Sequence, residues 1–251
     1  MPCHPFFVIR SYNASFMNDD DECIIGYQAF LDEIKKRNSY FGKKLTDRQL
    51  KIIQTKVLEG QQRYYISSFA KAKDCLPMWR TYGNEGNGIA VGLDSEILAS
   101  NGFPAYSCIY DSNTIDRIVK GLCDWSDSVT NLTDDDILSF NKSIYLLSFL
   151  AKNHHFNYEQ ECRICSYFEV FTKNNTASFN NGTKSYDIQF ECRNGRINSF
   201  IEIEMPISVL KEIWIGPTNC YDSSLASLNM WLNSLRLNDK VAIHKSSVPL
   251  K

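Results

Sequence analysis

Tyr64-Tyr-Ile-Ser-Ser-Phe69 marks the point at which the sequence changes from a helical to a strand-like pattern. This segment is dense in aromatic and β-branched residues, which favour strands. Before it, apolar residues recur at helical spacing over residues 24–37 and 50–57, and Thr46-Asp-Arg-Gln49 forms a capping box at the start of the second segment. A strand-rich region therefore follows a helical one in the same chain.

Strand-like and helical segments alternate through the rest of the sequence. Four segments are short, rich in β-formers and bounded by turn residues, as central strands are: 64–69, 89–93, 162–168 and 212–215. Apolar residues recur at helical spacing in four others: 76–82, 115–125, 134–152 and 223–235. Because regular strand–helix–strand spacing is missing, we expect an α+β fold rather than a doubly wound sheet. We predict a single domain over residues 1–251, with a mixed central sheet and helices packed around it.

Composition and charge exclude several classes of protein. Of the 251 residues, 43% are hydrophobic, which is enough for a sizeable core and excludes a disordered chain. The 27 Lys and Arg nearly balance the 29 Asp and Glu, so the bulk charge attracts neither nucleic acid nor an anionic membrane. The most apolar run, residues 144–151, is far shorter than the roughly 20 residues of a membrane span. No secretory signal precedes the nine scattered cysteines, so we expect a cytoplasmic globular protein.

The stretch after residue 66 combines hydroxyls, aromatics and glycines. Ser67 ends a strand, Trp79 and Tyr82 lie three residues apart on a helical turn, and a glycine-punctuated hairpin follows. These features predict one wall of a pocket. The alternative is that the aromatics belong to the core and the glycines only form turns. The glycines are not a phosphate-binding loop, because no Gly-Lys-Ser/Thr ending is present.

A second stretch is rich in ionisable side chains and runs from Lys152 to Arg163. If it is extended, Glu159, Glu161 and Arg163 share one face of a strand. Such clusters are where pKa values are tuned for acid–base or electrostatic work. The alternative is an exposed edge strand with a local Glu–Arg salt bridge. We predict no metal site, since Cys162-Arg-Ile-Cys165 is a lone pair of cysteines and the histidines are adjacent.

Motifs along nearly the whole chain resemble a bacterial family catalogued as domain of unknown function 2971. In sequence order they are Phe16-Met-Asn18-Asp-Asp-Asp-Glu22, Ser67-Ser-Phe-Ala, Met78-Trp79-x-x-Tyr82-Gly, Gly88-Ile-x-x-Gly92, the Lys152 to Arg163 stretch, Glu212-Ile-x-Ile-Gly-Pro217 and Ile243-x-x-Ser-x-x-Pro249. Compared with the family, the first strand and helix are missing or shortened here. The resemblance implies little about function, because the family is largely uncharacterised.

A second resemblance is to ADP-ribosyltransferase folds. Arg10, Ser67 or Ser68, and Glu159-x-Glu161 occur in the order in which those folds place an Arg, a Ser and a Glu-x-Glu. The resemblance implies that Glu161 stabilises the ribosyl cation of NAD as nicotinamide leaves, with Glu159 and Ser67 as the other catalytic candidates.

Two hypotheses about function follow. The first is an NAD-dependent ADP-ribosyltransferase or NAD glycohydrolase in a bacterial defence or toxin setting, with NAD as its substrate. The alternative is a non-catalytic sensor module that binds a nucleotide or a partner. The candidate substrate-binding residues are Trp79, Tyr82, Arg163, Lys152, His155, Asn18, Glu22 and Arg10. We expect the aromatics and the Glu–Glu–Arg row to converge on one cleft, with Asn18 and Glu22 at its rim. The sequence identifies no protein partner.

Overall fold

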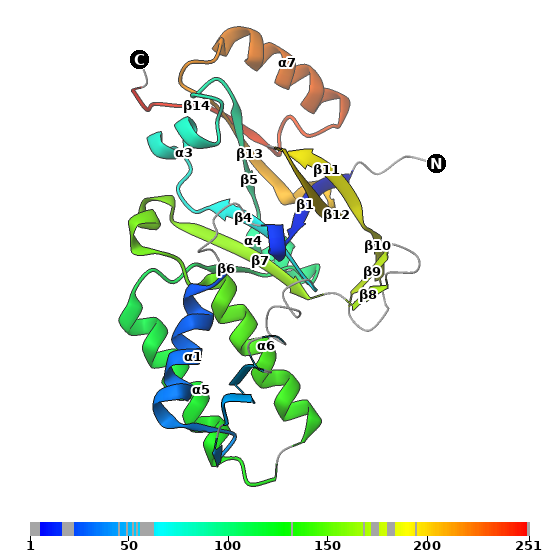
Figure 1. Cartoon of the computed structure of the whole chain (residues 1–251). Helices are drawn as coiled ribbons and strands as arrows, with labels where there is room; N and C mark the ends of the chain where they lie inside the picture. Colours follow the sequence, from blue (N-terminus) through cyan, green and yellow to red (C-terminus); the bar gives the residue numbers. More distant parts are fainter. Residues whose placement is uncertain are drawn as a thin grey trace.

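A six-stranded sheet lies between a bundle of helices and a smaller sheet (Figure 1). The computed structural model describes residues 6–16, 23–44, 46–48, 50–51, 53, 55, 63–131, 133–167, 169–171, 176–179, 184–193 and 195–249. The six strands, in order across the sheet, are β11 (Gln189–Arg193), β12 (Arg196–Pro206), β1 (Phe6–Asn13), β4 (Tyr64–Ala70), β7 (Glu161–Tyr167) and β6 (Ala105–Ser107). Every neighbouring pair in this sheet is antiparallel.

The smaller sheet has three strands and contains both parallel and antiparallel pairs. Its order is β14 (Ala242–Lys245), β13 (Leu210–Ile215) and β5 (Ile89–Leu93). The β13–β14 pair is parallel and the β13–β5 pair is antiparallel. Two further antiparallel units are formed by β10 (Lys184–Asp187), β9 (Thr176–Phe179) and β8 (Glu169–Phe171), and by β2 (Ser39–Tyr40) and β3 (Lys43–Lys44). The predicted α+β class is confirmed, and the single-domain organisation stays a prediction.

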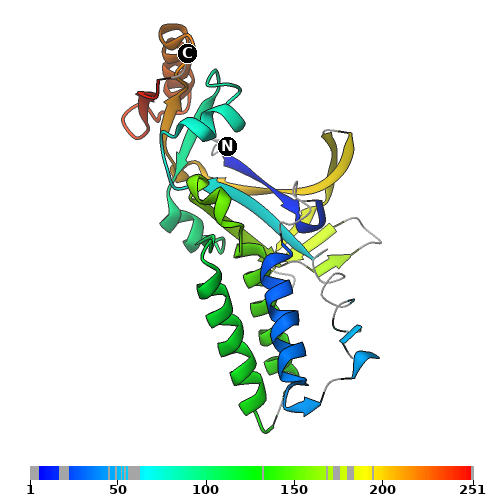
Figure 2. The ribbon, with the colours of Figure 1, turned by 60° about the vertical axis from the view of Figure 1, so that its left-hand side comes forward.

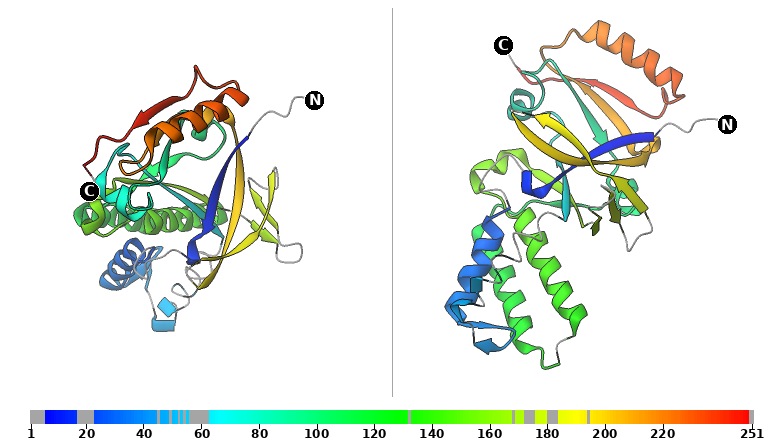
Figure 3. Two further views of the ribbon diagram at one scale, coloured as in Figure 1. Left: turned by 90° about the horizontal axis from the view of Figure 1, so that it is seen from above. Right: turned by 45° about the vertical axis from the view of Figure 1, so that its right-hand side comes forward.

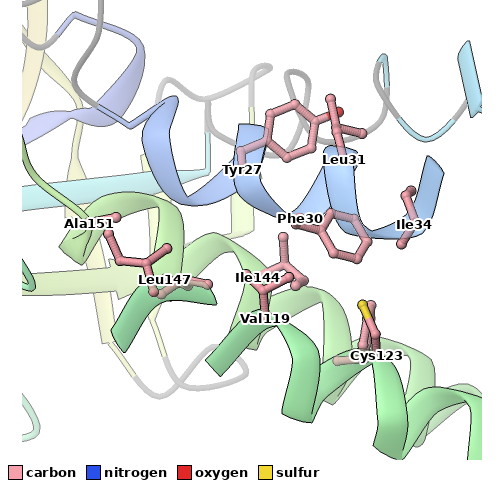
Figure 4. Packing of buried hydrophobic residues seen from close by; sticks show 11 residues of the cluster. Tyr27, Phe30, Leu31, Ile34, Val119, Cys123, Ile144, Leu147 and Ala151 are labelled. Atoms are coloured by element: carbon pink, nitrogen blue, oxygen red, sulfur yellow. The ribbon is translucent and has the colours of Figure 1, made fainter. Parts of the chain in front are cut away.

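Three helices form the bundle below the large sheet: α1 (Ile25–Arg37), α5 (Ser112–Ser128) and α6 (Asp134–Leu150). Figure 2 shows them side by side, extending away from the sheet. Their facing apolar side chains form one core, in which Phe30, Ile34 and Ile144 are almost completely buried (Figure 4). Spacing of three or four residues places these side chains on one face of each helix, which is why the sequence pattern located the helices.

The remaining helices with described bounds lie outside the bundle. They are α3 (Leu76–Thr81), α4 (Ser95–Ser100), α7 (Tyr221–Ser234) and the 3-10 helices η1 (Ala14–Phe16), η2 (His154–Glu159) and η3 (Ile207–Val209). The side chain of Leu232 in α7 packs with Leu210 and Ile213 of β13. The helix expected over residues 50–57 lies largely outside the described residues.

The prediction of a central strand at residues 89–93 is wrong. Strand β5 lies at the edge of the small sheet, and Ile89 and Val91 are 50% and 44% exposed. A short apolar run has the same appearance in sequence whether it pairs on one side or on both. The apolar residues here therefore did not distinguish an edge strand from a central one.

Long-range pairing holds the large sheet together. Strand β1 pairs along most of its length with β12, from Phe6 opposite Pro206 to Tyr12 opposite Phe200, and Figure 3 shows the two strands alongside one another. The core behind this pair includes Ile9, Ile201 and Ile203. Among the described residues, no helix combines the length and apolar composition needed to cross a membrane.

Candidate functional site

A pocket of about 470 Å³ lies between α3, the ends of β4 and β7, and the β5–β13 pair. Small side chains leave this space open, among them Ala70, Ala90 and Gly92. A methyl group added at Gly92 would collide with the side chain of Glu212, which lies directly over it. A concave, mostly apolar hollow with a few polar groups is the usual composition of a small-molecule site.

Trp79 forms part of the α3 wall and is held rigidly. It is buried, and its Nε1 donates a hydrogen bond to Oδ1 of Asp74 at 2.7 Å. Asp74 also accepts from the hydroxyl of Ser246 at 2.7 Å and from the backbone N–H of Ser247 at 2.8 Å. Burial alone would raise the pKa of Asp74, but these hydrogen bonds outweigh it and hold the pKa below its usual value. The network fastens α3 to the segment that follows β14.

Polar groups from the small sheet form the floor of the pocket. Glu212 and Trp214 lie two residues apart on β13, and so on one face of it. Nζ of Lys73 lies 3.1 Å from Glu212 Oε1, and Nε2 of His244 lies 3.5 Å from Oε2. The rings of Trp214 and His244 stack with their centroids 4.6 Å apart. We refer to Glu212 and Trp214 as the pocket floor.

Sequence reasoning missed the pocket floor. The segments around Glu212 and His244 were recognised as family-like but received no role. Their meeting depends on the parallel pairing of β13 with β14, which puts Trp214 opposite His244. The one available signal was that Glu212 and Trp214 alternate with buried isoleucines on a strand.

A buried ionic cluster lies beside the pocket and consists of Lys152, Glu159, Glu161 and Arg163. Nζ of Lys152 is 2.5 Å from Oε2 of Glu159 and 2.6 Å from Oε2 of Glu161. The guanidinium of Arg163 donates from Nε to Glu161 Oε1 at 2.6 Å and from Nη2 to Oε2 at 3.0 Å. All four residues are buried, Arg163 most completely at 1% exposed.

The local backbone explains how the two glutamates reach the same lysine. Glu161 and Arg163 share a face of β7, as the alternation predicts. Glu159 instead ends the 3-10 helix η2, and Gln160 adopts a left-handed conformation with φ 43° before the strand begins. The condition for Glu159 to share that face, an extended segment, is therefore not met, because the chain turns at Gln160.

The cluster keeps Glu161 ionised. Burial favours the neutral carboxyl and by itself would raise the pKa of Glu161. Hydrogen bonds and charge from Arg163, together with hydrogen bonds from Lys152 and Ser68, have the larger effect, so the pKa lies below its usual value. Arg163 also donates to the backbone carbonyl of Phe149 at 2.7 Å, near the end of α6. The cluster therefore connects the large sheet to the helical bundle.

Tyr82 connects the two arrangements. It lines the pocket with Trp79, and its hydroxyl lies 3.5 Å from Oε1 of Glu159. Glu159, Glu161 and Arg163 are not among the residues that line the pocket. The aromatics and the ionic row are thus neighbours through the contact between Tyr82 and Glu159, and the aromatics line the pocket whereas these charged residues do not.

The other candidate residues lie apart from the pocket. Ser67 stands opposite Ile164 in the β4–β7 register, on the opposite face of β4 from Ser68, which stands opposite Arg163. Its hydroxyl pairs with that of Ser11 and donates to the carbonyl of Arg10 at 3.1 Å. The spacing did not reveal which of two adjacent serines faces Arg163.

Arg10 and His155 lie at the surface. Arg10 pairs with Glu202 and Glu191 at 3.0 and 3.2 Å. His155 is exposed at the start of η2. Asn18 and Glu22 lie outside the described residues. Within the described ranges, no group of three or more His, Cys, Asp or Glu residues is arranged to hold a metal ion.

One family model matches the chain, over residues 78–164. Its description is Protein of unknown function (DUF2971). The match supports the family resemblance of the sequence, and it runs from the α3 wall of the pocket through the ionic cluster. No curated protein and no solved structure matches the chain.

Proposed function

We propose that this chain is a binding module for a small organic anion that carries a planar ring, with the size and chemistry of a nucleotide. The observation that carries the proposal is the pocket itself. It joins an aromatic and apolar wall, formed by Met78, Trp79 and Tyr82, to two lysines on the loop after β4. A ring would pack against the wall, and an anionic group would meet the lysines.

The two lysines support an anionic ligand. Lys71 and Lys73 both line the pocket and are exposed. Lys71 interacts electrostatically with Cys162, another residue that lines the pocket. Burial raises the pKa of the Cys162 thiol, and the positive charge of Lys71 offsets part of that rise. Lys73 is partly compensated by Glu212, so Lys71 is the cation that we expect to contribute most to anion binding.

The ionic cluster favours binding over catalysis. Both carboxylate oxygens of Glu161 already accept hydrogen bonds from Lys152 or Arg163. Two adjacent cations compensate its charge, so Glu161 would add little stabilisation to a developing ribosyl cation. Ser68 stands opposite Arg163 in the β4–β7 pair. Ser67, the other catalytic candidate, lies on the opposite face of β4 from Ser68.

Titration calorimetry with ADP as the probe tests the proposal. We expect the wild-type chain to bind ADP with a Kd below 1 mM, which corresponds to about 4 kcal/mol. Lys71→Met is expected to weaken binding several-fold, and Lys211→Met is the matched control because Lys211 is exposed and not among the residues that line the pocket. Equal Kd values for the two variants, or no heat at millimolar ADP, would contradict the proposal.

The NAD-consuming reading has a separate test. Incubation of the wild-type chain with NAD, followed by chromatography for free nicotinamide, measures turnover directly. The binding proposal expects no release above buffer. If the wild type releases nicotinamide and Glu161→Gln does not, with the folded fraction unchanged, the transferase or glycohydrolase hypothesis would replace the binding proposal.

A further inference from the structure

One edge of β5 carries backbone groups that the small sheet does not use. Among the described strands, β5 pairs with β13 alone and lies at the edge of its sheet (Figure 1). At one end of the pair the N–H of Gly216 donates to the carbonyl of Gly88 at 3.0 Å. At the other end the N–H of Asp94 donates to the carbonyl of Val209 at 2.8 Å. Because residues along a paired strand alternate in the direction of their backbone groups, the odd-numbered residues of β5 direct theirs away from β13: Ile89, Val91 and Leu93.

This open edge borders the pocket. All five residues of β5 line the pocket, although successive side chains of a strand point to opposite faces. A hollow that contacts every residue of a strand in turn runs along its edge rather than over one face. Ile89 and Val91 are 50% and 44% exposed, so the edge is open to solvent. The N–H and C=O groups of the odd-numbered residues are therefore accessible to a ligand in the pocket.

Strand β5 lacks the features that usually protect an edge from further pairing. Edge strands commonly carry charged residues or proline, and Ile89-Ala-Val-Gly-Leu93 has neither. Ala90 and Gly92 stand opposite Trp214 and Glu212 of the pocket floor, and their small size leaves room on that face for the side chains of an added strand. On the other face, the exposed side chains of Ile89 and Val91 offer apolar contact.

The recessed position of the edge favours a single peptide over a second copy of the chain. Two β5 edges would have to meet directly in order to pair, but each lies in a pocket that α3 and the loop after β4 enclose. A single extended strand needs only about 5 Å beside its neighbour. Lys71 and Lys73 lie on the same loop and line the pocket, so an acidic side chain on the peptide is complementary in charge.

We infer that the open edge of β5 binds an extended acidic peptide, which joins the three-stranded small sheet as an additional strand. The backbone groups of Ile89, Val91 and Leu93 supply the hydrogen bonds, and an acidic side chain of the peptide lies toward Lys71. This inference goes beyond the proposed function and does not depend on it, because the β5 backbone holds the peptide and the aromatic wall is not required. A peptide and a small ligand would compete for the pocket.

Fluorescence polarisation with a defined peptide tests strand addition. The probe alternates valine and threonine and carries one glutamate, at the N-terminal end in one version and at the C-terminal end in the other, since a strand can be added in either direction. We expect at least one version to bind the wild-type chain with a Kd below about 1 mM. N-methylation of the valines alone, or of the threonines alone, removes the N–H groups from one edge of the peptide. One of these modifications should weaken binding about tenfold and the other should not.

Variants at Val91 assign the binding to the edge. Val91→Pro removes an N–H that does not bond to β13, so the small sheet should still form, as circular dichroism can check. We expect it to bind the probe about tenfold more weakly than the wild type. Val91→Thr is the matched control because it keeps the N–H, and it should bind within about twofold of the wild type. A probe with glutamine in place of glutamate should bind several-fold more weakly to the wild type and no more weakly to Lys71→Met.

Several outcomes would overturn the inference. They are no binding of either version of the probe, equal effects of the two N-methylated sets, equal binding by Val91→Pro and Val91→Thr, and equal binding of the glutamate and glutamine probes. A wild-type dimer in sedimentation that Val91→Pro dissociates would assign the edge to a second copy instead. If Val91→Pro does not fold, the N-methylated peptides decide the question on the wild type. ADP binding is measured without peptide, so the proposed function and this inference can fail independently.

Discussion

Glu161→Gln is expected to destabilise the fold strongly without changing its shape. The buried cluster holds two cations, Lys152 and Arg163, and two anions, Glu159 and Glu161, so its charges balance. The substitution leaves one uncompensated positive charge in a site where every member is buried. Removing one partner of a buried ion pair costs about 3–5 kcal/mol of unfolding free energy. The total unfolding free energy of a folded protein is only about 5–15 kcal/mol.

Urea unfolding followed by circular dichroism measures this loss. With a typical slope of about 2 kcal/mol per molar urea, the midpoint should fall by roughly 2 M. The matched control is Glu202→Gln, because Glu202 also pairs with an arginine Nε, that of Arg10 at 3.0 Å, but at an exposed site. This control should leave the midpoint unchanged. If the two variants unfold at the same urea concentration, the reasoning about buried charge is wrong.

A double variant checks that charge balance is the cause. Lys152→Met alone leaves Glu159 and Glu161 with one cation between them. Lys152→Met combined with Glu159→Gln restores neutrality around Glu161 and Arg163. We expect the double variant to be more stable than Lys152→Met, with a coupling energy of about 1–3 kcal/mol. Additive losses would refute the idea of a coupled cluster.

Three further predictions concern stability and reactivity. The folded-state pKa of Glu161 is lowered from 4.5, so the stability that its charge contributes is complete above pH 4.5 and is lost as the pH falls through the folded-state pKa. At pH values below 4.5, the urea midpoint of the wild type should therefore decrease more steeply with falling pH than the midpoint of Glu161→Gln. Phe30→Ala should cost about 3–5 kcal/mol in the same assay, because Phe30 is 1% exposed in the bundle core; a loss below 1 kcal/mol would contradict the packing. Burial raises the pKa of the Cys108 thiol to about 12, so iodoacetamide should label the exposed Cys192 and Cys220 within minutes at pH 8 and leave Cys108 unlabelled, as peptide mass spectrometry can show; equal labelling would indicate local opening around Cys108.

Helices were the part of the fold that the sequence predicted best. Residues 24–37 and 134–152 were expected as helices, and α1 and α6 occupy nearly the same ranges. Their apolar positions repeat over several turns, so the signal is local and long. The pairing of strands was not predictable. For example, β1 pairs with a strand about 190 residues away, and neither segment carries a pattern that identifies the other as its partner.

The candidate site was predictable in its types of residue and less so in its geometry. Alternation correctly put Glu161 and Arg163 on one face of a strand. The turn at Gln160, which brings Glu159 to Lys152, depends on one residue in a left-handed conformation and leaves no repeating pattern. The pocket floor lies on one strand, but its neighbours come from β5 and β14 through tertiary pairing, so the alternation of Glu212 and Trp214 alone did not show that they line a pocket.

The pairing of β1 with β12 also has a consequence for synthesis on the ribosome. Arg10 and Glu202, which form an ion pair in the finished sheet, are separated by 192 positions. At roughly 5–20 residues per second, most of β1 waits about 10–40 s for its partner to emerge. During that interval the apolar residues Phe6 to Ile9 form an unpaired strand that can associate with other nascent chains. Strand β1 is therefore translated long before the strand that protects it, and the yield of folded protein should depend on translation speed and on chaperones that bind exposed apolar strands.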